Sequence, residues 1–87
     1  MHAKFDGLAF VSQESYYSSL VQEAGCSDLL VRAFVNVVGH NSFSADQYIS
    51  TLAAMESWID TGLPLDASLL PSDKGFDLEY VPPPWPF

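Results

Sequence analysis

The sequence is poor in the residues that build disulfide frameworks and metal sites. Its 87 residues include one cysteine, Cys26, and two histidines, His2 and His40. A single thiol excludes an internal disulfide framework and a cysteine-rich zinc module. The histidines lack the close spacing of zinc ligands, and the acidic turn around Gly75 lacks the ligand order of a calcium loop. We therefore expect neither a metal ion nor another cofactor.

Positive charge is the second scarce feature. Three Lys and Arg residues stand against 11 Asp and Glu residues, which gives a formal net charge of −8. Binding to a phosphate backbone needs clustered Lys and Arg, and no glycine-rich phosphate-binding motif is present. Residues 39–43 resemble the turn of a helix-turn-helix, but the helix expected after them carries no cation to read a groove. The composition thus excludes direct nucleic-acid binding.

Long apolar runs are also missing. The longest candidate, residues 29–38, is interrupted by Arg32 and Asn36, whereas a membrane span needs about 20 apolar residues. The apolar stretch 8–11 is too short for the core of a signal peptide, and Asp6 precedes it. Together with a free thiol, these features favour a cytoplasmic protein that does not contact a membrane.

The sequence is rich in apolar and aromatic residues. It is 48% hydrophobic and 14% aromatic, too apolar for a disordered acidic tail. The length fits one domain. We predict a mainly α fold, a small three-helix bundle over residues 1–81, followed by a proline-rich aromatic tail at 82–87 that favours polyproline II. So small a chain buries only about 60–65% of its unfolded surface, and the excess apolar surface favours a homodimer or a bound partner.

Two of the three predicted helices come early in the chain. The first spans 13–24, with Ser12 as N-cap and Gly25 after its end. Its apolar stripe is Tyr16, Tyr17, Leu20, Val21 and Ala24. The second spans 28–38, between Ser27 and Gly39. Its β-branched composition leaves a strand as the alternative, but Asp28, Arg32 and Asn36 recur every four residues as one polar stripe, which favours a helix at the centre of the bundle.

The third predicted helix has the strongest local signals. Ser44 and Gln47 form a capping box, and Phe43 and Tyr48 occupy the positions of a hydrophobic staple. Gly62 ends the helix near residue 61. One face carries the apolar side chains Tyr48, Ile49, Leu52, Met55 and Ile59.

The segment after this helix is more extended. Residues 66–70 can form one helical turn, and 72–75 form a turn in which Gly75 can take a positive φ. Residues 76–80 alternate with period two, which is typical of a half-buried strand. A lone strand needs a partner, and residues 5–11 are the other extended candidate, so we expect a short β pairing of the N- and C-terminal segments.

The candidates for catalysis are few. Cys26, which precedes a predicted helix, is the candidate thiol nucleophile. His40 is the candidate base, with Asn41 or Asp28 as a third group. No motif surrounds these residues, and they are interpreted as a small buried thiol and a loop histidine. Glu56 and Asp60, one helical turn apart, are interpreted as surface acids. We therefore expect no enzymatic activity.

The acidic residues are unevenly distributed. Residues 44–87 hold seven acids and one base, a net charge of −6, whereas residues 1–43 hold four acids and two bases, a net charge of −2. Glu56 and Asp60 stand in the C-terminal half of a helix, where the dipole favours cations. The plain alternative is a surface that only aids solubility. The predicted partner-binding residues combine acids with aromatic anchors: Glu56, Asp60, Asp66, Asp73, Asp77, Glu79, Trp58, Trp85 and Phe87.

These patterns predict a function in binding. The leading hypothesis is a non-enzymatic acidic protein that inhibits or modulates a basic, nucleic-acid-binding protein. Its most concrete form is a nucleic-acid mimic of the anti-restriction or anti-CRISPR kind, as produced by phages, with carboxylates where phosphates would lie. The alternative is a structural or accessory subunit that homo-oligomerises through its apolar surface.

Overall fold

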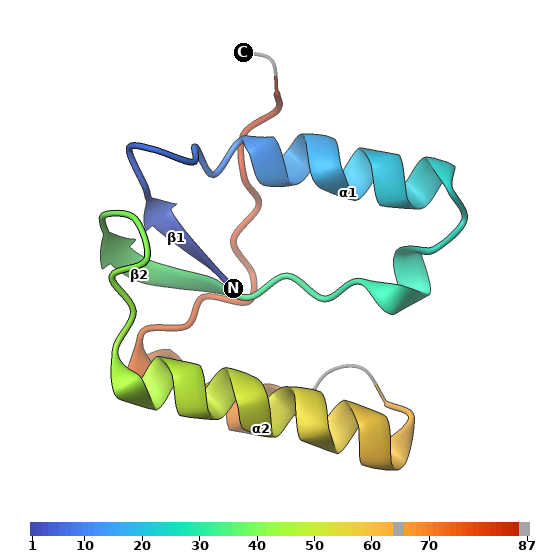
Figure 1. Cartoon of the computed structure of the whole chain (residues 1–87), viewed down its shortest axis with the longest axis vertical. Helices are drawn as coiled ribbons and strands as arrows, with labels where there is room; N and C mark the ends of the chain where they lie inside the picture. The colour runs from blue at the N-terminus through green and yellow to red at the C-terminus, as the bar shows by residue number, and fades with distance from the viewer. Residues whose placement is uncertain (64–65, 86–87) are drawn as a thin grey trace.

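The computed structural model describes residues 1–63 and 66–85 (Figure 1). Its strands are β1 (His2–Phe5) and β2 (Phe34–Val38), and its α-helices are α1 (Gln13–Glu23) and α2 (Ala45–Thr61). Short 3₁₀ turns stand at η1 (Ser27–Leu29), η2 (Ala67–Leu69) and η3 (Ser72–Lys74). The strands pair in parallel, and α1 lies in the crossover between them. The protein is thus a small mixed α/β fold, and the prediction of a three-helix bundle is wrong.

The error lies in the second predicted helix. Residues 34–38 form a strand, which is the alternative that the valine-rich composition left open. The supposed polar stripe does not exist, because Asp28 lies in η1, Arg32 in the extended segment that follows, and Asn36 at an exposed position of β2. Backbone pairing on both edges of β2 outweighs the four-residue spacing of three polar side chains.

Both terminal segments pair their backbones with β2 rather than with each other. His2 and Ala3 pair with Phe34 and Val35 on one edge. On the other edge, the Asn36 N–H donates to the Gly75 oxygen and the Asp77 N–H to the Phe34 oxygen, each at 2.8 Å. The expected β pairing of the two terminal segments is therefore wrong, and the strand predicted at 76–80 is reduced to one antiparallel bridge between Val35 and Phe76.

Helix α1 forms where the sequence predicts it, but it is hardly buried. It ends before Gly25, which takes a φ of +75°. Ser12 stands at the predicted N-cap position, but its backbone is already helical and its side chain accepts no capping hydrogen bond, so that part of the prediction is wrong. The predicted apolar stripe also fails to pack, because no α1 residue is buried and Tyr16 and Tyr17 are half exposed.

Helix α2 confirms the local signals. Ser44 and Gln47 form both hydrogen bonds of the capping box. The rings of Phe43 and Tyr48 meet edge to face with centroids 5.6 Å apart, which is the predicted staple. Gly62 ends the helix with a φ of +74°.

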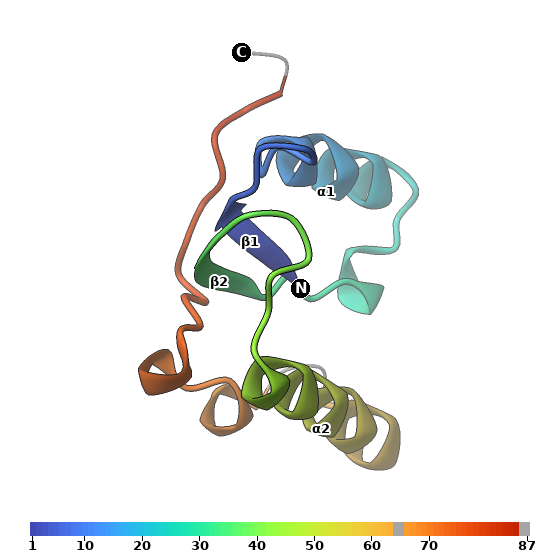
Figure 2. The ribbon, with the colours of Figure 1, turned by 60° about the vertical axis from the view of Figure 1, so that its left-hand side comes forward.

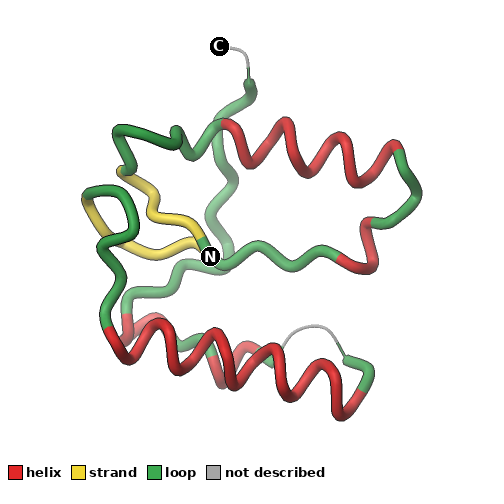
Figure 3. The backbone as a smooth tube through the Cα atoms, in the orientation of Figure 1, coloured by secondary structure: helices red, strands yellow, loops and turns green. Residues whose placement is uncertain are grey.

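The hydrophobic core is small and lies around β2. Val35 and Phe76 are its most buried large side chains, with Ala3, Ala33 and Leu70 around them. The two helices lie on opposite sides of the sheet and do not pack on each other, while long loops connect the elements (Figures 2 and 3). The accessible surface is 5724 Å², against about 5,100 Å² for a typical monomer of this mass. Many large apolar side chains consequently stay in solvent.

Candidate functional site

Helix α2 exposes its large apolar side chains. Ile49, Leu52 and Ile59 are 64%, 70% and 76% exposed. They follow one another at three- and seven-residue spacing, so they lie along one side of the helix. We call this surface the α2 outer face; it comprises Tyr48, Ile49, Leu52, Met55 and Ile59, each of which is exposed. The sequence predicts this set as one face, but the structure turns it to solvent.

The opposite side of α2 explains that orientation. Gln47 and Ser50 are the buried residues of the helix. The Gln47 side chain accepts a hydrogen bond from the Ser44 N–H at 3.0 Å and donates one to the Lys74 oxygen at 2.9 Å. Small side chains such as Ala54 let the core approach closely. The hydrogen bonds of Gln47 and the small side chains thus turn this side of α2 toward the core, which leaves the bulky apolar residues in solvent.

An apolar groove borders the outer face. One part, about 130 Å³ in volume, lies between α2 and residues 31–33, and a second part, about 360 Å³, extends it toward Leu29 and Gly62. Met55 and Trp58 line both parts. We call the whole the α2 groove; its lining is Met1, Leu29, Val31, Ala33, Thr51, Ala54, Met55, Trp58, Ile59, Gly62 and Leu70. Ridge and groove form one continuous apolar surface.

Acidic side chains lie beside this surface. Glu56 and Asp60 are exposed, and Asp46 stands in the first turn of α2. The helix contains no Lys or Arg. Glu56 follows Leu52 by four residues and Asp60 follows it by eight, so both carboxylates border the outer face. Two of the predicted acids are thereby placed together with exposed apolar residues.

Of the other predicted acids, Asp66 lies beside the C-terminal part of α2, where it lines a hollow with Ser57 and Thr61, whereas the remaining three lie in or after η3. The Lys4 ammonium donates a hydrogen bond to Asp77 at 2.9 Å and holds the pKa of that carboxyl below its usual value. Asp66 accepts a hydrogen bond from the Ser68 N–H at the start of η2. Asp73, within η3, and Glu79 are exposed. Of these four acids, Asp66 therefore lies beside α2, Asp77 is paired with Lys4, and Asp73 and Glu79 stand singly.

The predicted aromatic anchors lie in different parts of the chain, and the two that the structure describes are not brought together. Trp58 is half-buried in the α2 groove. The first residues of the proline-rich segment pass the start of α1, where Ser15 Oγ donates to the oxygens of Pro82 and Pro83 at 3.0 and 2.9 Å (Figure 1). Trp85, at the end of this described stretch, is half-buried, and Phe87 lies outside the described residues.

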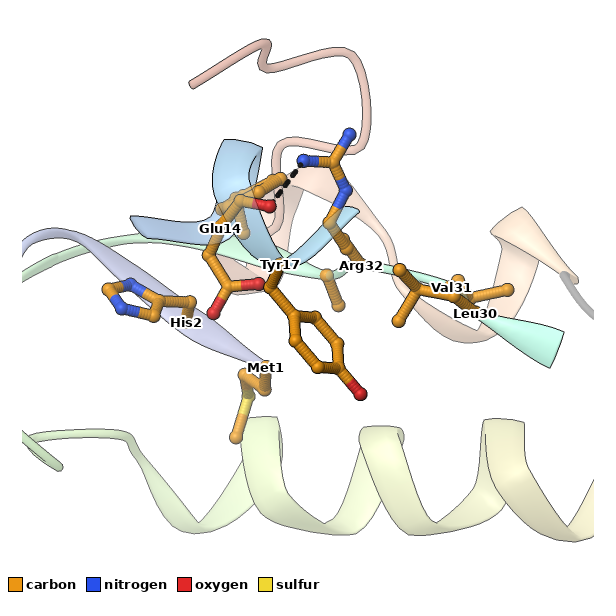
Figure 4. Close-up of a pocket in the computed structure, with 9 residues that line it drawn as sticks. Met1, His2, Glu14, Tyr17, Leu30, Val31 and Arg32 are labelled. Carbon is orange, nitrogen blue, oxygen red and sulfur yellow. Dashed lines mark hydrogen bonds between the residues drawn. The ribbon is translucent and has the colours of Figure 1, made fainter. Parts of the chain in front are cut away.

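A second cavity lies beneath α1. Its volume is about 330 Å³, and Glu14, Tyr17 and Arg32 line it (Figure 4). Arg32 donates to the backbone oxygen of Glu14 at 3.4 Å, and its guanidinium stands over the ring of Phe34 at 5.6 Å. Arg32 and Lys4 are thus held by internal contacts, and Lys74 is the exposed Lys or Arg among the described residues.

The candidate nucleophile pair is not assembled. His40 Nδ1 lies 2.7 Å from Asp6 Oδ2, whereas the Cys26 thiol contacts the oxygen of Ala24. Across residues 1–63 and 66–85 no hydrogen bond joins Cys26 to His40, and no cluster of His, Cys, Asp and Glu side chains could hold a metal ion. Sequence reasoning missed the Asp6–His40 pair because 34 residues separate its members.

Asp6 makes folding stability pH-dependent. Burial alone would raise the pKa of Asp6. The hydrogen bonds from the Ala9 N–H, the His40 side chain and the Leu8 N–H lower it by a larger amount, so the pKa is about 2 instead of 3.8. Because the folded-state pKa is lowered, the stabilisation is present above about pH 4 and is lost as the pH falls toward 2.

We expect Asp6→Asn to flatten the loss of stability between pH 4 and 2, measured as denaturation midpoints across this range. Asp73→Asn, an exposed control, should keep the wild-type slope; equal slopes in both variants would contradict the role of Asp6.

In the part of the chain that the structure describes, no helix has the length and apolarity to cross a bilayer. Comparison of the whole chain with protein-family models, with curated proteins and with solved structures finds no match in any of the three. The exposed face of α2 and the acids beside it are therefore the features of the molecule that bear on its function.

Proposed function

We propose that the chain is a non-enzymatic acidic protein that binds a partner with a basic surface and inhibits or modulates it. The observation that carries this proposal is the α2 outer face, where Leu52 and Ile59 stand in solvent beside Glu56 and Asp60 with no cation on the helix. Exposed apolar side chains rimmed by one sign of charge are typical of interaction surfaces.

Apolar and acidic residues would contribute differently to this binding. Burying one Leu or Ile side chain fully contributes roughly 1.5–3 kcal/mol, so the outer face supplies affinity. The carboxylates steer a positively charged partner and disfavour acidic ones. Helix α2 itself carries no Lys or Arg that would compensate this attraction.

A nucleic-acid-binding protein is the partner class we favour. Its basic channel is built for phosphates, and carboxylates on α2 would compete for the same cations. Such competition is the physics of nucleic-acid mimicry of the anti-restriction or anti-CRISPR kind. The single thiol, Cys26, suits a reducing cytoplasm, where such a partner would be met.

The test is affinity capture from the native host with the wild-type chain and two charge variants. Glu56→Gln/Asp60→Asn removes two charges from α2, and Glu14→Gln/Glu23→Gln removes two from α1. We expect a basic captured protein whose affinity falls about tenfold, or 1.4 kcal/mol, in the α2 variant and little in the α1 variant. Competition with nucleic acid for that protein should follow the same order.

Either of two results would refute the proposal. A captured partner with a neutral or acidic surface removes the electrostatic argument. A basic partner whose affinity is indifferent to salt and to both charge variants removes it as well, because ion contacts at a protein surface weaken as salt rises.

Self-association is a second candidate function. It is favoured by the accessible surface of 5724 Å² and by the helical spacing of the exposed apolar residues on α2. A structural or accessory subunit of this kind would form dimers at tens of micromolar in sedimentation experiments. A strictly monomeric chain under those conditions would exclude it.

A further inference from the structure

We propose that the α2 outer face and the α2 groove receive a basic amphipathic helix of the partner, laid along α2. This inference rests on the proposed function and deepens it, because it names the recognised element. The occupant would present apolar residues at helical spacing with Lys or Arg on their flanks.

The dimensions of the site suit a helix. Helix α2 has 17 residues and is about 26 Å long at 1.5 Å per residue. Its exposed apolar residues, from Tyr48 to Ile59, span about three turns. A partner helix of three to four turns can therefore set anchors at i, i+3, i+4 and i+7 against the ridge and into the groove.

The chemistry of the lining points the same way. The backbone groups of α2 are paired within the helix, so this surface offers side-chain packing rather than strand addition. Met55 and Trp58 line both parts of the groove. An unbranched thioether adapts to irregular apolar partners, and an indole supplies a large rigid contact area. Both properties are common where amphipathic helices dock.

The charge of α2 favours a basic partner over a second copy of this chain as the occupant. Asp46, Glu56 and Asp60 are the charged residues of α2, and all three are acidic. In an antiparallel pair of α2 helices, Glu56 and Asp60 of the two copies would lie along the same side of the shared seam, where like charges repel. A helix with Lys or Arg beside its apolar residues instead gives each carboxylate an opposite charge. Complementarity thus favours a different, basic chain.

The direct test uses a synthetic probe. A labelled 14-residue peptide of Leu and Lys, with the Leu residues on one helical face, is titrated with the full chain and followed by fluorescence anisotropy. We expect binding that weakens steadily as salt rises. A peptide of the same composition with the Leu residues scattered around the helix should bind at least about tenfold more weakly, and a Leu and Glu peptide should not bind.

Matched variants locate the site. Leu52→Ser and Glu56→Gln/Asp60→Asn should each weaken binding of the Leu and Lys peptide about tenfold. Leu8→Ser changes a residue that is 79% exposed in the loop between β1 and α1, and Glu14→Gln/Glu23→Gln removes the same number of negative charges from α1. Neither control should change the affinity appreciably. Leu52 is 70% exposed, so its replacement leaves the core intact, which circular dichroism checks.

Three outcomes would overturn the inference. Equal weakening by the α1 and α2 charge variants would mean diffuse attraction to the whole acidic surface, which leaves the proposed function standing. Failure of the peptide to bind, while a basic protein is still captured, would mean another mode of recognition. A dimer that dissociates on Leu52→Ser and excludes the peptide would identify a second copy as the occupant.

Discussion

Replacing Phe76 by alanine is expected to destabilise the protein by about 3–5 kcal/mol, the usual cost of removing a buried phenylalanine. Phe76 is 2% exposed and faces Val35, which is fully buried. Since a domain of this size has a total stability of roughly 5–10 kcal/mol, this single change would remove about a third or more of it. Denaturant titration followed by circular dichroism measures the loss.

Phe5→Ala is the matched control for this experiment. Phe5 lies in β1 but is 60% exposed, so the same truncation should change stability by no more than about 0.5 kcal/mol. Comparable losses in the two variants would mean that the core does not centre on Phe76 and β2. A large difference between the two variants would show that the few buried side chains provide much of the stability of the fold.

The parts of the fold that were predictable from sequence are those specified locally. The boundaries of α2 follow from Ser44, Gln47 and Gly62, whose backbone and side-chain preferences act within one turn. The 3₁₀ turn after Asp66 and the positive φ of Gly75 follow from the same kind of signal. Each of these features needs no information from the rest of the chain.

What sequence reasoning misplaced depends on contacts between distant segments. Residues 34–38 are extended because β1 and the segment around Phe76 supply hydrogen bonds on their two edges. Neither partner is visible in the window that holds the strand. The spacing of Asp28, Arg32 and Asn36 is compatible with a helix, but periodicity over so short an apolar run does not separate helix from strand.

The candidate site shows the same division. The sequence identifies the apolar set of α2 and the acids Glu56 and Asp60, but not which side of the helix faces solvent. That orientation depends on Gln47, which reaches 27 residues along the chain to Lys74. Likewise, Asp77 looks like a free acid in the sequence, whereas the structure pairs it with Lys4, 73 residues away.

Gln47 is accordingly the residue whose loss should most disturb α2. Gln47→Ala removes the hydrogen bonds to the Ser44 N–H and the Lys74 oxygen. Each of these hydrogen bonds contributes about 0.5–1.5 kcal/mol, since both partner residues are exposed and water can replace the lost amide, so we expect a loss of about 1–3 kcal/mol in denaturant titration. Ser68→Ala, which changes an exposed residue outside α2, is the control and should cost far less.

Coupling between Gln47 and Gly75 sharpens this prediction into a double-mutant cycle. Gly75 has a φ of +93°, and a Cβ added there would lie 2.8 Å from Gln47 Nε2. Gly75→Ala alone should therefore cost the strain of a left-handed residue, about 1–3 kcal/mol, together with displacement of the Gln47 amide. In the Gln47→Ala background the displacement vanishes and only the strain remains. The double variant should be more stable than the sum of the single losses by about 0.5–3 kcal/mol. Strict additivity would mean that Gln47 does not hold the inner side of α2 against the η3 turn, and the outward orientation of Leu52 and Ile59 would then lose its cause.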